Sequence, residues 1–221
     1  MVALSVNVNK VATVRNSRGG RLPSVLDAVR VCVEAGAPGI TVHPRADARH
    51  ITSRDVHEIA GYLRSLSPHV EYNIEGDPRP DLIRLVHEVK PAQCTLVPVR
   101  QGEITSEAGW PASTPLEHLG GIVREMKDAG IRVSIFVDPE EAPIRWAARV
   151  GADRVELYTE PYARAFERGD AERRASFATY VNAATLAASL GMGVNAGHDL
   201  DRKSTRLNSS HVSESRMPSS A

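Results

Sequence analysis

Neither sign of charge predominates in this chain of 221 residues, which has 27 Lys and Arg against 27 Asp and Glu. A net charge of zero argues against general nucleic-acid binding, which normally requires a basic excess. Only two cysteines are present, Cys32 and Cys94, and both lie within apolar segments, which predicts reduced core residues. No apolar run approaches the ~18 residues of a membrane span, and the N-terminus lacks a signal-peptide pattern. We therefore expect a cytoplasmic protein with neither nucleic acid nor membrane as a partner.

Short apolar runs alternate with segments of helical periodicity along most of the chain. Strands are predicted over residues 2–8, 39–43, 70–74, 94–97, 132–137, 154–158 and from 193 onward, and helices over 25–34, 53–66, 80–90, 115–129, 140–150 and 171–190. Strict alternation with short connections is typical of parallel βαβ units. Seven strands are more than most doubly wound sheets of this length contain. The sequence therefore predicts an α/β fold, a (β/α)8 TIM barrel in which the last strand is unaccounted for.

The C-terminal segment, residues 202–221, differs in composition from the rest of the chain. Serine dominates it and apolar periodicity is lost, so it has no face to bury. We expect residues 1–201 to form the barrel domain, and residues 202–221 to be a disordered, non-native tail in place of the last βα unit. A native low-complexity tail is the alternative. An open barrel is expected to have poor stability and little activity, because its end strands keep unpaired edges and its interior is exposed.

Polar side chains stand at the C-terminal ends of the predicted strands. Parallel strands point their C-termini in one direction, so a barrel gathers such residues on a single rim, where barrel enzymes hold their active sites. Two histidines and two carboxylates on one rim indicate a proton-transfer site. The residues are Asn7, Asn9, Lys10, His43, Arg45, Glu75, Glu156, Asn195 and His198. Glu156 lies inside its strand, and a structural salt bridge explains it equally well.

Arginine is concentrated near the start of the chain, at Arg15, Arg18 and Arg21, and recurs at Arg45. Guanidinium groups match phosphate oxygens in bidentate geometry, so this set indicates recognition of a phosphorylated small molecule. Arg18 precedes a Gly-Gly pair in a loop that can mould to a ligand. Arg21 is explained equally well as a solvated surface charge.

Six segments, taken in order, resemble the pyridoxine 5′-phosphate synthase family of the deoxyxylulose-dependent vitamin B6 pathway. They are SVNVNKVATVRNSRGG, GITVHPRADARHI with the following TSRDV, NIEG, LVPVRQGEITSEAGW, VELYTEPYA and VNAGHDL. The resemblance spans about residues 4–200. It implies a (β/α)8 barrel that joins 1-deoxy-D-xylulose 5-phosphate to 3-amino-2-oxopropyl phosphate, with pyridoxine 5′-phosphate, inorganic phosphate and water as products. It also implies a homo-octamer that uses neither a cofactor nor a metal ion.

The resemblance also implies a role for each matching residue. His43 and Glu75 are expected to be proton acceptors, His198 the proton donor, and Glu156 the group that stabilises charge in the transition state. The expected substrate ligands are Asn7 and Arg18 for the aminoketone phosphate, Asn9, Lys10, Arg45, His50 and Thr105 for the deoxyxylulose phosphate, and Asp199 as a further contact. The chain departs from the family at Asn9-Lys10, where members often carry Asp-His, and it lacks the Gly-His turn that ends the last strand.

Other functions fit part of this pattern. A different phosphosugar aldolase or isomerase would use His43 and Glu75 as acid and base. A Schiff-base aldolase would need a lysine at a strand end, and only Lys10 is placed for that. A non-catalytic barrel that binds a phosphorylated metabolite is the third possibility.

Overall fold

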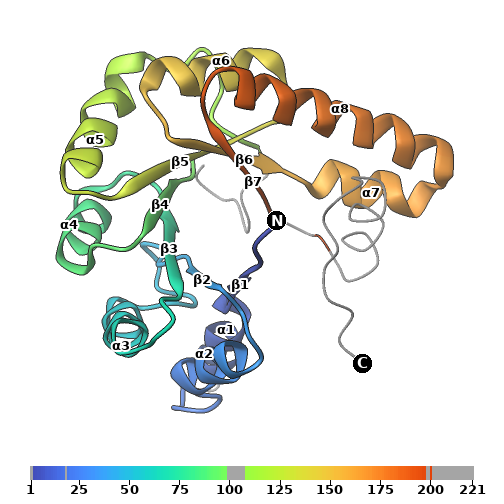
Figure 1. The fold of residues 1–221 in the computed structure, drawn as a ribbon. Coiled ribbons are helices and arrows are strands. Elements are labelled where there is room, and N and C mark those ends of the chain that lie inside the picture. The colour runs from blue at the N-terminus through green and yellow to red at the C-terminus, as the bar shows by residue number, and fades with distance from the viewer. Residues whose placement is uncertain (1, 18, 99–107, 198–199, 201–221) are drawn as a thin grey trace.

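The computed structural model describes residues 2–17, 19–98, 108–197 and 200, and within them seven strands form one parallel sheet in the order β1 to β7 (Figure 1). The strands are β1 (Ser5–Asn7), β2 (Gly39–Val42), β3 (Glu71–Gly76), β4 (Gln93–Leu96), β5 (Arg132–Val137), β6 (Arg154–Tyr158) and β7 (Gly193–Gly197). The helices are α1 (Asn9–Ser17), α2 (Val25–Glu34), α3 (Ser53–Arg64), α4 (Pro80–Val89), α5 (Leu116–Asp128), α6 (Glu141–Val150), α7 (Glu160–Arg168) and α8 (Asp170–Ser189).

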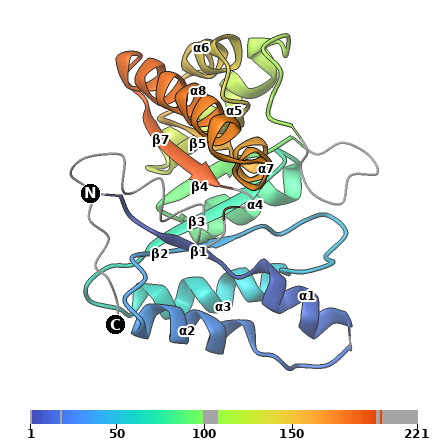
Figure 2. The ribbon, with the colours of Figure 1, turned by 90° about the vertical axis from the view of Figure 1, so that its right-hand side faces the viewer.

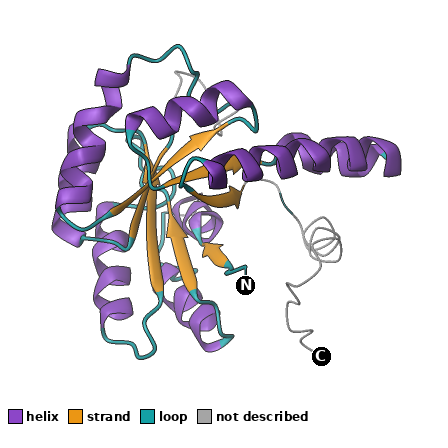
Figure 3. Ribbon diagram, turned by 45° about the horizontal axis from the view of Figure 1, so that its top comes forward, coloured by secondary structure: helices purple, strands orange, loops and turns teal. Residues whose placement is uncertain are grey.

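The strands fan into a curved sheet, and the helices lie around its outer side (Figure 3). Each strand pairs in parallel with the next one along the chain, as successive βα units of a barrel do. Within the described residues, β1 pairs only with β2 and β7 only with β6. The predicted α/β fold is therefore confirmed as a TIM-barrel-like, incomplete barrel.

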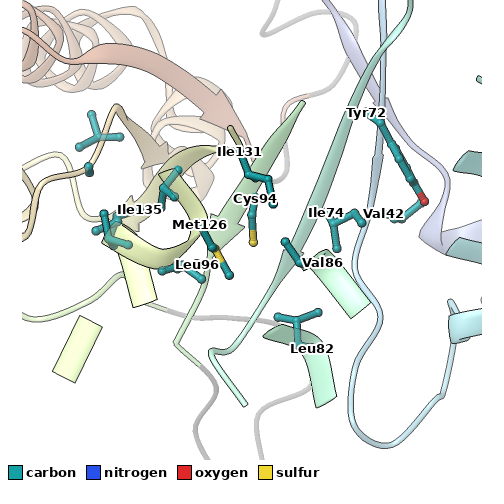
Figure 4. Packing of buried hydrophobic residues seen from close by; sticks show 14 of the residues in the cluster. Val42, Tyr72, Ile74, Leu82, Val86, Cys94, Leu96, Met126, Ile131 and Ile135 are labelled. Carbon is teal, nitrogen blue, oxygen red and sulfur yellow. The ribbon is translucent and has the colours of Figure 1, made fainter. Parts of the chain in front are cut away.

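The apolar core lies between the outer face of the sheet and the helices. Every second strand residue faces outward, and these side chains are fully buried at Ile74, Leu96 and Ile135. Leu82 and Val86 of α4 pack onto this layer, as Figure 4 shows from close by. The amphipathic helices thus bury one apolar stripe each against the sheet.

Several helix boundaries follow from local chemistry that the sequence displays. Thr52 caps α3, because its hydroxyl accepts from the backbone N–H of Asp55 while the Asp55 carboxylate accepts from the backbone N–H of Thr52. Pro80 begins α4, where its missing N–H costs nothing. Gly151 ends α6 with a φ of 95°, a left-handed conformation that favours glycine.

Three features differ from the predictions. Helices α1 and α7 were not predicted, and β3 continues to Gly76, so Glu75 lies inside a strand and not after it. The segment of α1 combines asparagine, serine and β-branched residues, whose helix propensities are low, and only tertiary contacts make it helical. For α7 a signal was present, since a proline stands in its first turn.

The two end strands are more exposed than the five between them. Ser5 and Asn7 are exposed in β1, as are Val194 and Ala196 in β7. The predicted tail, residues 202–221, lies outside the described residues. In the part of the chain that the structure describes, none of the helices has the length and apolar character needed to cross a membrane.

Candidate active site

Polar side chains line the inner face of the curved sheet. Asn73 of β3 is the centre of a buried cluster, and its amide nitrogen lies 3.4 Å from the Thr41 hydroxyl. Its side-chain oxygen accepts from the Thr95 hydroxyl at 3.0 Å and from the Gln93 amide at 3.2 Å. These bonds join β2, β3 and β4 through their inward side chains, so the polar groups stay satisfied although water is excluded.

Glu75 and Glu156 face the interior from β3 and β6, and only 6% of each residue is exposed. Burial, together with the nearby charge of Glu156, raises the pKa of Glu75 well above its usual value. Asn73 lies near Glu75, with its amide nitrogen 3.4 Å from the Glu75 Oε1. Gly197 leaves room for Glu156, because a Cβ at that position would lie 2.9 Å from the Glu156 Oε1. Burial thus favours the neutral form of Glu75, which interacts with a second carboxyl group, that of Glu156.

His43 stands directly after β2 and is buried. Its backbone N–H donates to the side-chain oxygen of Asn9 at 2.9 Å, and the backbone N–H of Asn9 donates to the side-chain oxygen of Asn7 at 2.9 Å. The ring of His43 meets the ring of His50 edge-on, with centroids 5.9 Å apart. The structure therefore brings four of the predicted site residues together, while Lys10 is exposed on the first turn of α1.

The loop between β2 and α3 carries Arg45 and His50. Burial and the positive charge of Arg45 lower the pKa of His50 to about 4, so its ring is neutral near pH 7. The Nδ1 atom of His50 is buried and has no hydrogen-bond partner among the described residues. Asp47 lies 3.5 Å from the Arg45 Nε, and the hydrogen bond from Arg49 is the main cause that lowers the pKa of Asp47 to about 2.

Arg15 has a different role from the one its sequence position indicated. Its guanidinium binds both carboxylate oxygens of Asp55, at 2.5 and 2.9 Å. Such a bidentate pair satisfies the fork of the guanidinium inside the protein. Arg21 is exposed. The phosphate-ligand interpretation of Arg15 thus loses its basis. Arg45, whose charge acts on His50, stays a candidate phosphate ligand.

Four predicted site residues, Arg18, Thr105, His198 and Asp199, lie outside the described residues. Across residues 2–17, 19–98, 108–197 and 200, no group of three or more His, Cys, Asp or Glu side chains could hold a metal ion. The expectation that no metal or cofactor is needed stays a prediction.

The polar cluster of Asn73, Thr95 and Gln93 was missed from the sequence, although a signal for it was present. Parallel strands buried on both faces normally read as continuous apolar runs. Here Gln93 and Thr95 alternate with Cys94 and Leu96. A polar residue at every second position of a strand that must be buried indicates a polar barrel interior.

Comparison with solved structures supports the fold. The YdjI aldolase from Escherichia coli K12 superposes with a TM-score of 0.52 at 12% identity, covering 78% of this chain and 70% of the aldolase. A mandelate oxidase variant with a monooxide FMN adduct gives a TM-score of 0.54 at 16% identity, covering 87% and 67% of the two chains. At such identities the likeness shows the fold alone.

Comparison of sequences is far more specific. A pyridoxine 5′-phosphate synthase from Cytophaga hutchinsonii is 49% identical over 201 residues, which cover 91% of this chain and 81% of that relative. A synthase of the same name from Bacteroides fragilis is 50% identical over 200 residues, covering 90% and 81%. The model of one protein family, described as pyridoxal phosphate biosynthesis protein PdxJ, matches residues 4–214. The chain therefore belongs to the PdxJ family of pyridoxal phosphate biosynthesis proteins.

Proposed function

We propose that the chain is a pyridoxine 5′-phosphate synthase, which condenses 1-deoxy-D-xylulose 5-phosphate with 3-amino-2-oxopropyl phosphate. The observation that carries the proposal is the similarity to relatives of that name, which are 49% and 50% identical over 81% of their own length. The products are pyridoxine 5′-phosphate, inorganic phosphate and water.

The reaction suits a site made of acids and bases. The substrate amine itself condenses with a ketone, so no enzyme lysine is needed as a Schiff-base nucleophile. Loss of phosphate, ring closure and dehydration then require proton transfers in both directions. Several acid–base groups in different environments serve that sequence better than a single group.

We assign the proton transfers to His43, Glu75 and His198, with His43 and Glu75 as acceptors and His198 as donor. The raised pKa of Glu75 supports this role, because a catalytic carboxyl group works best when its pKa lies near the operating pH. Glu156 stabilises charge that develops in the transition state. Its position on the inner face supports that assignment, since a carboxylate there acts through a medium of low polarity.

We assign the deoxyxylulose phosphate to the side chains after β1 and β2, namely Asn9, Lys10, Arg45 and His50, with Thr105. The Nδ1 atom of His50 supports this, because a buried polar atom that has no partner among the described residues is suited to a ligand. Asn7 and Arg18 hold the aminoketone phosphate, and Asp199 is a further substrate contact. We also propose a homo-octamer that works in the cytoplasm without a metal or cofactor.

The test is to incubate the purified chain with both substrates and to measure pyridoxine 5′-phosphate by mass spectrometry and inorganic phosphate by colorimetry. Product is expected only when both substrates are present, and in small amount, because an open barrel is expected to have little activity. Borohydride trapping of either substrate on Lys10 would instead indicate a Schiff-base aldolase. Binding of both substrates without any product would indicate a non-catalytic binding barrel and overturn the proposal.

A further inference from the structure

Helix α1 lies against the loop between β2 and α3, the loop that carries Arg45 and His50. Figure 2 shows α1, α2 and α3 gathered along the same side of the sheet, around β1 and β2. Side chains from both ends of α1 reach the loop. Asn9 at its first turn accepts from the backbone N–H of His43, and Arg15 and Asn16 at its last turn contact the far end of the loop.

The last turn of α1 is held by an ion pair between Arg15 and Asp55, which is buried in the first turn of α3. Burial works against ionisation of Asp55, but hydrogen bonds from Arg15 and Thr52 outweigh it and hold its pKa below the usual value. Arg15 completes its fork by donating from Nη2 to the carbonyl oxygen of His50 at 3.3 Å. The ion pair therefore fixes Arg15 relative to both α3 and the loop.

Arg15 in turn orients Asn16. The Arg15 Nε donates to the side-chain oxygen of Asn16 at 2.9 Å, so the amide nitrogen of Asn16 faces the loop. That nitrogen donates to the carbonyl oxygens of His50, at 2.8 Å, and of Ala48, at 3.3 Å. A chain of hydrogen bonds thus runs from Asp55 through Arg15 and Asn16 to the loop backbone.

These hydrogen bonds hold the backbone of the loop next to Ala48, a residue in an unusual conformation. Its φ is 49°, a left-handed conformation that is unfavourable for a non-glycine residue and persists only where its surroundings hold it. The backbone N–H of Ala48 donates to the carbonyl oxygen of Arg45 at 3.0 Å, which closes a turn from Arg45 to Ala48, two residues before His50. The conformation of Ala48 therefore sets the spacing of the two side chains on either side of it.

We infer that Arg15 and Asn16 are positioning residues, which brace the β2–α3 loop in the shape that presents Arg45 and His50 to the deoxyxylulose phosphate. This inference rests on the proposed function for the identity of the ligand. The support of the loop by Arg15 and Asn16 follows from the contacts of α1 alone and does not depend on the ligand. Neither residue touches the substrate in this scheme, and both act through the backbone of Ala48 and His50.

The test uses Asn16→Ala, which removes the bonds to both carbonyl groups while keeping α1, because alanine has the highest helix propensity. Thr13→Ala is the matched control. Thr13 is exposed on the same helix, and its hydroxyl donates to the carbonyl oxygen of Asn9 within that helix. Isothermal titration calorimetry measures the Kd of each substrate separately, and hydrogen exchange by mass spectrometry follows the loop amides.

Asn16→Ala is expected to speed exchange of the loop amides about tenfold and to weaken binding of the deoxyxylulose phosphate by a similar factor, since both hydrogen bonds of Asn16 to the loop carbonyl groups are lost. Binding of the aminoketone phosphate and the thermal midpoint are expected to match those of Thr13→Ala. Arg15→Lys keeps the charge opposite Asp55 but loses the bond that orients Asn16, so it should give the same pattern with about a threefold effect.

Unchanged loop exchange in Asn16→Ala would overturn the inference, as would equal weakening of both substrates together with a lower thermal midpoint, which indicates a general loss of structure. If the unsubstituted chain binds neither substrate, the proposed function fails, and the exchange measurement still decides whether α1 braces the loop.

Discussion

The outer and inner faces of the sheet are both buried, yet they are built from opposite kinds of side chain. On β5 the neighbours Ile135 and Ser134 are each fully buried, the first among helix side chains and the second within the polar interior. On β3, Ile74 packs outward while Glu75 faces inward. The outer face gains stability from apolar area, whereas the inner face bears polar groups whose burial costs free energy unless they are paired. The outer face thus stabilises the fold, and we propose that the inner face supplies the acid–base groups of the reaction.

The largest effect should come from Glu75→Gln, which removes a titratable group from the inner face without changing its shape. Turnover is expected to fall at least about 100-fold, because general acid–base groups contribute ~10²–10⁴ to rate. The free energy of unfolding near pH 7 should stay equal or rise, since a buried carboxyl group is replaced by a neutral amide. Product formation and urea denaturation measure the two quantities.

The control for that variant is Glu71→Gln, on the same strand and the same face but at the opposite end. Glu71 is half-exposed and pairs with Arg132 at 2.5 Å. It should keep its turnover and lose less than about 1 kcal/mol of stability. If both variants lose turnover equally, the proposed separation between the catalytic rim and the rest of the interior is wrong.

A second, intermediate effect is expected from adjacent substitutions on β5. Ile135→Ala should lower the free energy of unfolding by about 2–5 kcal/mol, because it leaves a cavity in the fully packed outer layer. Ser134→Ala should cost less than about 1 kcal/mol, since it removes one weak contact, with the Asn195 amide at 3.4 Å. Urea titration of both variants compares the faces directly, and equal costs would contradict the assignment of stability to the outer face.

The smallest predicted effect is a difference in how Glu75 and Asp55 make the free energy of unfolding depend on pH. The pKa of Glu75 is raised in the folded chain, so above its ordinary value of about 4.3 the unfolded state loses a proton that the folded state keeps, and stability falls as pH rises. The pKa of Asp55 is lowered, so its contribution is fully present above about pH 4 and is lost as pH falls through the folded-state value.

Thermal melts of the unsubstituted chain, Glu75→Gln and Asp55→Asn across pH 3–8 should separate these contributions. Above pH 4.5, Glu75→Gln is expected to remove a fall in the free energy of unfolding of at most ~1.4 kcal/mol per pH unit. Asp55→Asn is expected to reduce the loss of stability that occurs as the pH falls below about 4. Identical curves for Glu75→Gln and the unsubstituted chain would show that Glu75 titrates normally in the fold.

Much of the outer face was predictable from the sequence. Runs such as RVSIFV and RVELY carry enough β-branched, aromatic and other apolar residues to be recognised, and the structure has strands at Arg132–Val137 and Arg154–Tyr158 as predicted. Helix α2 likewise has the predicted bounds, Val25–Glu34. These elements depend on local periodicity, which a single sequence displays.

The inner face of the sheet and the contacts of α1 with the β2–α3 loop were harder to predict, because they depend on residues far apart in the chain. The pairing of Arg15 with Asp55 spans 40 positions, and neither residue indicates its partner. The helical state of α1 follows from such contacts and not from its own propensity. The sequence predicts a strand that ends at Ile74, just before Glu75, whereas pairing of Gly76 with Leu96 in β4 extends the ladder by two residues beyond Ile74.

The polar inner face also shapes how the stability of this chain responds to temperature. Unfolding exposes both faces, and apolar surface raises the heat capacity by about 0.45 cal/K/mol per Å² while polar surface lowers it by about 0.26. The contribution of the Asn73 and Thr95 side chains therefore opposes that of Ile74 and Leu96. We expect a smaller heat-capacity change than in a barrel of equal size with an apolar interior, and a flatter stability curve, which differential scanning calorimetry measures directly.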